Sequence, residues 1–429
     1  MRYKPLPASF YTDNRSRLLE RLSSNCAVLI TSNDIMPTNA DGVMPFRQNN
    51  DLFYLTGIDQ EDTCLLLAPH FPDESLRQIL FLKKTNEHIK IWEGQKLNKE
   101  QGSERSGIAT VKWSEELEGT LATVLPEVEE IYLCRNEQDR SESRVQTRND
   151  KLIDEVKTQY PLHPLKRLAP VMQNLRTCKQ EAEIAMIRKA CEITRDGFVS
   201  VARQMKPGMF EYEMEAIWSY EFLRRGSRGF AYQPIVAAGA NSCVLHYVDN
   251  DQPMQAGDLV LMDVGAEYGN YNADLTRTLP ANGQFTERQK AVYDSVLHVK
   301  NEATKLLVPG NNLKDYQEAV GQLMEKELIK LGLLRSDEVA KQTDKSPLYR
   351  KYFMHGTSHH LGLDVHDVPS RYQAFQPGMV FTVEPGIYIP EENIGIRLED
   401  DVVLTAHQPI NLMEDIPIKT GDIEALMRS

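Results

Sequence analysis

The sequence lacks several features that would place it in other classes of protein. No uninterrupted apolar run approaches the length of a membrane span, and the first residues lack the apolar stretch of a signal peptide. The six cysteines are widely spaced and none forms a C-x-x-C pair, which excludes a thiolate zinc or redox site. Positive charge is in deficit, with 49 Lys and Arg against 62 Asp and Glu. The net charge of −13 argues against nucleic acid or an anionic membrane as the main partner, and we expect a cytoplasmic protein.

The length of 429 residues exceeds the usual size of one domain, so two domains are expected. Residues 1–170 mix short apolar strands with amphipathic helices and predict a smaller α/β domain. Pro161, Pro164 and Pro170 then punctuate the chain and indicate a linker. Residues 171–429 show a different order, in which long helices precede groups of strands. The sequence therefore predicts an α/β (α+β) protein whose larger domain is carboxy-terminal.

The order of elements in the larger domain occurs twice. In each half a capping box begins a long helical pattern that stops at Pro-Gly, and a second helix and several strands follow. The predicted boxes are Thr177 with Gln180 and Thr286 with Gln289.

Histidines and acids also recur at matching positions. In each half a histidine lies 17 or 18 residues before an acid, that acid lies six residues after a glycine, and a second acid follows. The corresponding residues are His246, Gly257, Asp263 and Asp274 in the first half and His366, Gly378, Glu384 and Glu399 in the second. One matching glycine could arise by chance, but the ordered match indicates an internal duplication about a pseudo-two-fold axis.

Three of these carboxylates lie within otherwise apolar strand patterns. A buried charge is costly unless something compensates it. One such acid alone would more often belong to a structural ion pair, but three in duplicated positions favour a shared metal site. The candidate ligands are Asp263, Asp274, His359, Glu384 and Glu399. Their four negative charges would balance two divalent cations, with Mn²⁺ expected and Co²⁺, Fe²⁺ or Zn²⁺ also suited to the donor set. Paired metals of this kind are suited to amide hydrolysis.

The sequence between the first two acids predicts a β-hairpin. Asp263 and Asp274 are 11 positions apart in the sequence. Between them, Tyr268-Gly269-Asn270 is typical of a turn. Two strands joined by that turn would bring both carboxylates to one place.

Four histidines lie in one short glycine-containing segment of the second half. His359 is the best candidate for the imidazole ligand. His360 should point the other way, because neighbouring side chains on an extended segment alternate. His366 and His246 are related by the duplication and would face the metals from opposite sides, where they could donate hydrogen bonds to a developing oxyanion.

Several strings resemble those of the proline-specific "pita-bread" metallopeptidases, and most closely the aminopeptidase P family. In the larger domain they surround the candidate ligands, at residues 261–266, 272–278, 355–368, 382–388 and 395–401. In the smaller domain, residues 45–57 resemble the aminopeptidase P amino-terminal domain. The resemblance implies a pita-bread fold for residues 171–429 and the activity of an Xaa-Pro aminopeptidase. Such a hydrolase removes the first residue of peptides that have proline in the second position.

The resemblance also implies a role for each ligand. Asp263 and Asp274 would bind one metal, and His359 and Glu384 the other. Asp274 and Glu399 would bridge the two metals. Glu384 would in addition carry a proton between the attacking water and the leaving amine.

Further residues are implied around the substrate. His246 and His366 would orient and stabilise the reacting amide. His355, Tyr388 and Arg397 would line or support the proline pocket.

The remaining implied roles concern supporting residues. Tyr232 and Arg397 would hold Asp263 in place. Trp92 resembles a tryptophan that in family oligomers reaches the active site of a neighbouring subunit, so a homodimer or homotetramer is expected. His360 stands where some relatives carry a bulky aromatic residue, a departure that would alter the rim of the pocket.

Two other functions remain open from the sequence. Prolidase shares the ligands and a related amino-terminal domain but cleaves only dipeptides. A non-catalytic peptide-binding protein on the same fold would lose metal ligands, whereas all five positions here hold acids or histidine. Methionine aminopeptidase would not need the large first domain.

Overall fold

The computed structural model describes residues 2–23, 25–138, 144–343, 346–368 and 372–429. The chain divides into two compact units, which are described separately below. One unit is Pro5–Arg176, and the other is Thr177–Ser429 together with the amino-terminal Met1–Lys4. None of the helices within these described ranges is long and apolar enough to cross a membrane. All six cysteines are free thiols.

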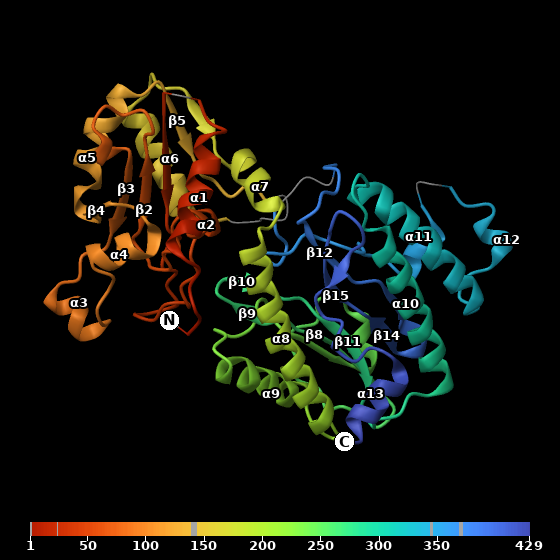
Figure 1. Cartoon of the computed structure of the whole chain (residues 1–429). Helices are drawn as coiled ribbons and strands as arrows, with labels where there is room; N and C mark the ends of the chain where they lie inside the picture. The colour runs from red at the N-terminus through yellow and green to blue at the C-terminus, as the bar shows by residue number, and fades with distance from the viewer. Residues whose placement is uncertain (1, 24, 139–143, 344–345, 369–371) are drawn as a thin grey trace. The chain divides into compact units, whose positions relative to one another are not determined.

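The unit Pro5–Arg176 is built on a mixed six-stranded sheet (Figure 1). In spatial order its strands are β4 (Thr110–Trp113), β3 (Gln78–Leu82), β2 (Cys64–Leu67), β1 (Cys26–Thr31), β5 (Glu130–Leu133) and β6 (Leu165–Arg167). The central strand β1 pairs antiparallel with β2 and parallel with β5. The helices are α1 (Ala8–Leu19), α2 (Asn50–Thr56), α3 (Glu87–Trp92), α4 (Lys99–Ser106), α5 (Leu117–Val124), α6 (Arg148–Gln159) and α7 (Ala169–Thr177).

The core of this unit lies between the sheet and two of its helices. Leu29, Leu66 and Phe81 from the strands share one buried apolar cluster with Leu121 of α5 and Val156 of α6. Every residue of β1 and β2 is buried, as expected for strands covered on both faces.

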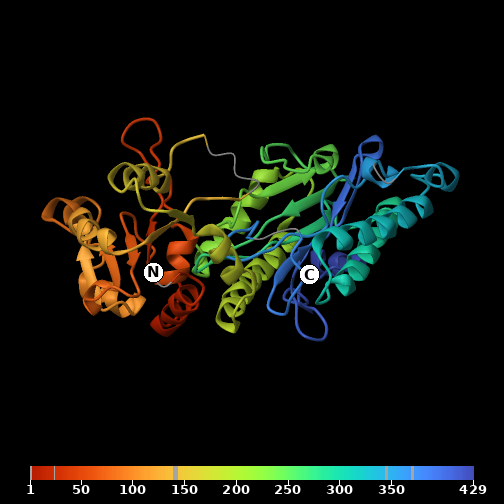
Figure 2. The same ribbon diagram turned by 90° about the horizontal axis from the view of Figure 1, so that it is seen from above.

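The other unit contains two halves with the same order of elements. The first half comprises α8 (Glu181–Gln204), α9 (Glu211–Arg224), β7 (Ile235–Ala238), β8 (Leu259–Asp263), β9 (Glu267–Tyr268), β10 (Tyr271–Asn272) and β11 (Thr276–Pro280). The second comprises α10 (Glu287–Leu306), α11 (Leu313–Lys330), α12 (Ser336–Val339), β12 (Val380–Val383), β13 (Gly386–Ile389), β14 (Ile394–Arg397), β15 (Asp400–Val403), β16 (Ile410–Asn411) and α13 (Thr420–Met427). Figures 1 and 2 show α8 to α11 gathered on one side of the strands of this unit.

Strands of the two halves meet at the centre of this unit. In the first half β8 lies between β7 and β11, and in the second β15 lies between β12 and β16. The backbone N–H of Glu399 donates to the carbonyl of Thr276 across the two halves (3.0 Å). The N–H of Gly395 donates to Ser242 Oγ (2.9 Å), again across the halves. The predicted duplication is therefore present as two similar halves joined through their strands.

The hairpin predicted between Asp263 and Asp274 is confirmed. Strands β9 and β10 pair antiparallel, with Tyr271 opposite Tyr268. Gly269 and Asn270 between them have φ of 60° and 69°. Two consecutive left-handed residues are the requirement of a tight two-residue hairpin turn, which Gly and Asn meet at low steric cost.

One of the two predicted helix starts is correct. Thr286 caps α10, with its side chain accepting from the backbone of Gln289. The prediction at Thr177 is wrong, because Thr177 is the last residue of α7 and α8 begins at Glu181. The backbone N–H of Gln180 instead donates to Glu183 Oε2 (2.9 Å), so the capping pair lies three residues later than predicted.

The amino-terminal strip, Arg2–Lys4, packs on the same unit as the two halves. Tyr3 is buried and its ring meets Tyr268 edge-on, with 6.1 Å between centroids. Arg2 Nη1 donates to the carbonyl of Ser227 (3.4 Å). These contacts place the strip against the β9–β10 hairpin before the chain enters the other unit.

Candidate metal centre and active site

The five predicted ligands are brought together by the ends of strands from both halves. Asp263 is the last residue of β8, and Asp274 lies just before β11. Glu384 follows β12, and Glu399 lies between β14 and β15. His359 comes from the segment that precedes β12, where its N–H donates to Thr382 Oγ1 (3.2 Å).

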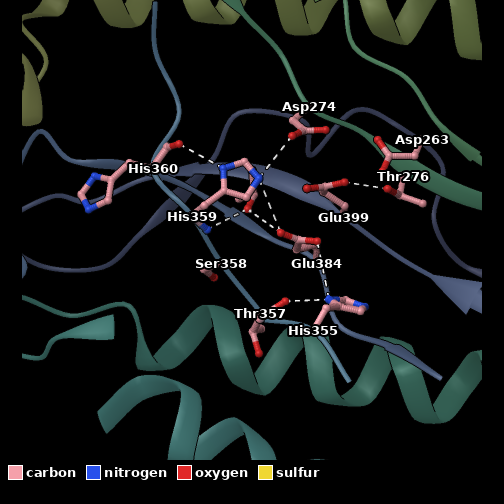
Figure 3. A network of polar contacts seen from close by, with 12 residues as sticks. Asp263, Asp274, Thr276, His355, Thr357, Ser358, His359, His360, Glu384 and Glu399 are labelled. Atoms are coloured by element: carbon pink, nitrogen blue, oxygen red, sulfur yellow. Dashed lines mark hydrogen bonds and ion pairs between the residues drawn. The ribbon is translucent and has the colours of Figure 1, made fainter. Parts of the chain in front are cut away.

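The ligand atoms face one another closely enough to hold cations. Single ligand atoms of Asp274, His359 and Glu399 all lie within 4.8 Å of each other. His359 Nε2 is 3.4 Å from Asp274 Oδ2 and 3.5 Å from Glu384 Oε1. Figure 3 shows the His359 ring pointing into this group of carboxylates. The fifth residue, Asp263, is joined to Asp274 through a tyrosine described below.

The orientation of His359 suits a metal ligand. Its Nδ1 lies 3.0 Å from the carbonyl oxygen of His360, so this nitrogen carries the proton and donates to that oxygen. The lone pair of Nε2 is then directed at the carboxylates. A backbone carbonyl that fixes the tautomer in this way is a common partner of histidine ligands.

Burial and mutual repulsion raise the pKa of three acids of the cluster. Burial, followed by the charge of Asp263, raises the pKa of Asp274 well above its ordinary value. Burial, followed by the charges of Asp274 and Glu384, does the same to Glu399. Burial raises the pKa of Glu384 to about 7, although His359 lowers it. Carboxylates held together in this way require positive charge, and four carboxylates with one imidazole fit a pair of divalent cations.

Two residues predicted to support Asp263 do contact it. The Tyr232 hydroxyl lies 2.5 Å from both Asp263 Oδ1 and Asp274 Oδ1. Arg397 Nη2 donates to Asp263 Oδ2 (2.7 Å). The hydroxyl and the guanidinium therefore fix the first carboxylate from two directions.

The predicted pocket residues form a chain of contacts between two candidate ligands, from Asp263 through Arg397, Tyr388 and His355 to Glu384. Arg397 Nη1 donates to the Tyr388 hydroxyl (2.9 Å), and that hydroxyl lies 2.8 Å from His355 Nε2. His355 Nδ1 is in turn 3.8 Å from Glu384 Oε2. Burial lowers the pKa of His355 to about 3, with the charges of Arg397 and His246 adding to the effect. His355 is therefore a neutral hydrogen-bonding group at neutral pH.

Three further predicted residues are His366, His246 and Trp92, and of these His366 lies next to a candidate ligand. The ring of His366 is 4.2 Å from that of His359, centroid to centroid. His246 is exposed, and its charge acts on His355 at the edge of the cluster. Trp92 belongs to the other unit, where 75% of its surface is exposed at the end of α3.

His360 points away from the other histidines, as Figure 3 shows. Its ring packs on Phe381, with 4.1 Å between centroids, and only 3% of the residue is exposed. The side chain is thus part of the core and not of a pocket rim.

The sequence reasoning missed several residues that contact the ligands. Thr276 Oγ1 donates to Glu399 Oε2 (2.6 Å), and Asp401 Oδ2 accepts from the backbone N–H of Asp274 (3.0 Å). Both lie two residues beyond a ligand in a strand pattern, so their side chains share its face of the strand. That spacing is the signal that could have identified them.

Comparisons with known proteins match both parts of the chain. Residues 185–406 match metallopeptidase family M24, and residues 11–132 match the aminopeptidase P amino-terminal domain. The chain is 36% identical to a protein named Xaa-Pro aminopeptidase from Escherichia coli (strain K12), over 96% of each chain.

Solved structures agree with this match. A putative aminopeptidase P from Bacillus anthracis superimposes with a TM-score of 0.92 at 34% identity, covering 99% of each chain. Aminopeptidase P from E. coli with the inhibitor Pro-Leu gives a TM-score of 0.89 at 33% identity, again over 99% of each chain. The chain belongs to metallopeptidase family M24, with a pita-bread catalytic region preceded by the amino-terminal domain of aminopeptidase P.

Proposed function

We propose that this chain is a metal-dependent Xaa-Pro aminopeptidase, which hydrolyses the first peptide bond of substrates that have proline second. One observation carries the proposal. Five ligand-type side chains from two duplicated halves converge in a chain that aligns over almost its whole length with an Xaa-Pro aminopeptidase.

The ligand set supports two divalent cations, and Mn²⁺ is the proposed metal. Carboxylate oxygens outnumber the single imidazole, a balance that favours Mn²⁺ over metals that prefer nitrogen and sulfur ligands. Asp263 and Asp274 would hold one cation and His359 with Glu384 the other, with Asp274 and Glu399 shared. Cations bound there would act as Lewis acids on water and on the scissile carbonyl.

The side chains around the cluster supply the remaining steps. Glu384 would accept a proton from the attacking water and return it to the leaving amine, because its carboxylate lies beside the other candidate ligands. His246 and His366 would orient the reacting amide and donate to the oxygen that gains charge. These groups would add proton transfer and oxyanion stabilisation to the Lewis acidity of the bound cations.

Selectivity for proline is assigned to His355, Tyr388 and Arg397. Their contacts give a buried, rigid wall next to Glu384. The dipeptide Pro-Leu, an inhibitor of the E. coli relative, is what remains when the first residue of an Xaa-Pro-Leu peptide is removed. A wall placed beside the proton shuttle is therefore suited to hold the proline ring on the leaving side.

Further proposals concern the cellular compartment, the oligomeric state and the domain bounds of the enzyme. Six free thiols support a reducing compartment, for which the cytoplasm is proposed. Ile91 and Trp92 are both 75% exposed, which supports a homodimer or homotetramer in which Trp92 is covered by a neighbouring subunit. We propose domains at residues 1–170 and 171–429. The division of the chain into two compact units supports two domains, although it falls after Arg176 and assigns residues 1–4 to the carboxy-terminal unit.

The function is tested with a peptide series on metal-free and reconstituted protein. The purified chain is treated exhaustively with chelator, then supplied with Mn²⁺, Co²⁺ or Zn²⁺. Release of the first residue is measured for an Xaa-Pro dipeptide, an Xaa-Pro-Xaa tripeptide and the matching Xaa-Ala-Xaa tripeptide. We expect cleavage of the Xaa-Pro tripeptide only, no activity without metal, and best recovery with Mn²⁺.

The same series separates the alternatives. Cleavage confined to the dipeptide would identify a prolidase. Binding of the peptides without turnover under every metal would identify a non-catalytic peptide-binding protein. Equal activity before and after chelation would refute the metal mechanism.

A further inference from the structure

The segment between β7 and β8 carries the exposed His246, to which the proposed function gives a role in orienting the reacting amide. Val244 and His246 are exposed, whereas Leu245 and Tyr247 on either side pack against a buried cluster that includes Leu261. A histidine donor must be held in place to act on a reacting amide, because small displacements of such a group are costly for turnover. The contacts that fix this exposed segment therefore matter for catalysis.

The segment is held by one buried carboxylate, Glu211. This residue is the first of α9 and is fully buried, with 0% of its surface exposed. Its Oε1 accepts from the N–H of Ala238 (2.8 Å) and from Asn241 Nδ2 (3.2 Å). Its Oε2 accepts from the hydroxyl of Tyr247 (2.8 Å) and from the N–H of Gln252 (3.0 Å).

The four donors enclose His246 on both sides along the chain. Ala238 and Asn241 precede His246, while Tyr247 and Gln252 follow it. The backbone N–H of Glu211 also donates to the carbonyl of Gln252 (3.0 Å). The first residue of α9 thus holds the segment on both sides of His246.

A carboxylate is required for this set of contacts. Both of its oxygens accept hydrogen bonds and neither donates, so four donors can be satisfied at once. A glutamine at the same position would retain one accepting oxygen and turn an NH₂ group towards two of the donors. The isosteric change would therefore loosen half of the contacts without altering the volume of the side chain.

We propose that Glu211 is a positioning residue for the aminopeptidase reaction, which holds His246 in its working place through Tyr247 and the backbone of residues 238–252. The inference rests on the proposed function, in which His246 orients the reacting amide. It assigns to the first turn of α9 a share in catalysis although Glu211 does not belong to the metal cluster.

The test is a double-mutant cycle on the full-length, metal-loaded enzyme. Glu211→Gln, His246→Ala and the double variant are compared for kcat, KM, metal content and thermal midpoint. Glu213→Gln serves as the matched control, because Glu213 lies in the same turn of α9 and, within the described part of the chain, accepts only from the N–H of Phe210. We expect Glu211→Gln to lower kcat at least roughly tenfold with KM and metal content unchanged, and Glu213→Gln to retain full turnover.

The cycle distinguishes positioning from general stability. If Glu211 acts through His246, its substitution will cause no further loss of kcat in the His246→Ala background. Additive losses, or a Glu211→Gln enzyme as active as the control, would overturn the inference. Full activity of His246→Ala would instead refute the role of His246 in the proposed function.

A milder variant covers the case in which Glu211→Gln does not fold. Tyr247→Phe removes one of the four donors and leaves the carboxylate and the backbone contacts in place. We expect a smaller fall in kcat that also disappears in the His246→Ala background. An unchanged kcat in Tyr247→Phe would contradict the route through this tyrosine.

Discussion

Three separate contacts fix Asp274 at the residue scale. Its Oδ1 accepts from the Tyr232 hydroxyl, its Oδ2 faces His359 Nε2, and its backbone N–H donates to Asp401 Oδ2. Asp401 belongs to the other half of the duplication, so the backbone as well as the side chain of Asp274 is tied across the two halves. These contacts fix the position that the proposed function assigns to a carboxylate shared between two cations.

Replacing Asp274 by asparagine tests that assignment. The amide has the same size but no charge, so we expect activity to fall by at least roughly a hundredfold and metal content to drop below two ions per chain. Circular dichroism should show an unchanged fold. Asp249→Asn, at an exposed position of the same half, provides the control. Full activity with two bound metals would contradict the shared role.

A second residue-scale prediction concerns Glu183, a buried acid away from the ligands. Burial raises its pKa from 4.5 to about 7, while Lys179 and the hydroxyl of Tyr271 oppose the shift. Because the folded pKa is the higher one, the contribution to stability is full below pH 4.5 and is lost as pH rises through about 7. The loss amounts to at most about 3 kcal/mol.

The measurement is the free energy of unfolding of metal-free protein across that pH range. We expect wild type to lose stability relative to Glu183→Gln between about pH 4.5 and 8. Glu181→Gln, at an exposed position in the same turn of α8, should follow the wild-type curve. Parallel curves for wild type and Glu183→Gln would show that the carboxyl is not strained by burial.

The sequence predicts the candidate ligands and two residues that contact Asp263, Tyr232 and Arg397, but not the other residues that orient the cluster. Asp263, Glu384 and Glu399 stand out because an acid in an apolar strand demands compensation. Thr276 and Glu211 carry no such signal, because threonine is ordinary in a strand and glutamate is ordinary in the first turn of a helix. The spacing from Asp274 places Thr276 on the same face of its strand, but the partners of Thr276 and Glu211 lie more than 20 residues away in sequence, and local patterns do not reveal such partners.

At the scale of elements, the exit from β8 depends on a close approach of two backbone segments. A Cβ atom on Gly265 would lie 1.8 Å from the carbonyl oxygen of Ala273. Gly265 follows Asp263 by two residues, and Ala273 immediately precedes Asp274. The approach therefore sets how near the first two carboxylates can come to one another.

Gly265→Ala should consequently separate these two acids. Because the obstructing atom belongs to the backbone, we expect a loss of about 1–3 kcal/mol in stability and weaker binding of Mn²⁺. Gly257→Ala is the control, since a Cβ atom at Gly257 would meet nothing within 4 Å. Calorimetric titration with Mn²⁺ and chemical denaturation measure the two effects. Wild-type affinity in Gly265→Ala would contradict the argument.

The sequence predicts the start of α10 correctly and the start of α8 wrongly, for a physical reason. Thr286 follows a loop and is free to cap α10, so the sequence pattern suffices. Thr177 has the same spacing to a glutamine, but α7 extends through it. A capping pattern describes local hydrogen bonds only. It does not reveal that Thr177 is already part of the preceding helix α7.

At the scale of the whole molecule, the candidate metal centre joins the two duplicated halves. Asp263 and Asp274 come from the first half, and His359, Glu384 and Glu399 from the second. Bound cations would replace repulsion among these acids by attraction across the junction. Metal binding should therefore stabilise the fold as well as enable the reaction.

This stabilisation is measurable as a shift of the thermal midpoint. At Mn²⁺ concentrations 100-fold above the dissociation constant, we expect a gain of about 2.7 kcal/mol, or roughly 5–10 °C for a unit of this size. Scanning calorimetry of chelated and Mn²⁺-loaded protein measures the shift. The Asp274→Asn variant should show little of it, and an equal shift in that variant would place the bound metal elsewhere.

The amino-terminal strip has a practical consequence for work with this protein. Arg2, Tyr3 and Lys4 contact Ser227 and Tyr268, so this strip lies against the hairpin that leads to Asp274. An affinity tag fused in front of the strip would sit beside the metal-binding half and disturb this packing. An excised fragment starting at Thr177 would likewise leave the hairpin without its Tyr3 cover.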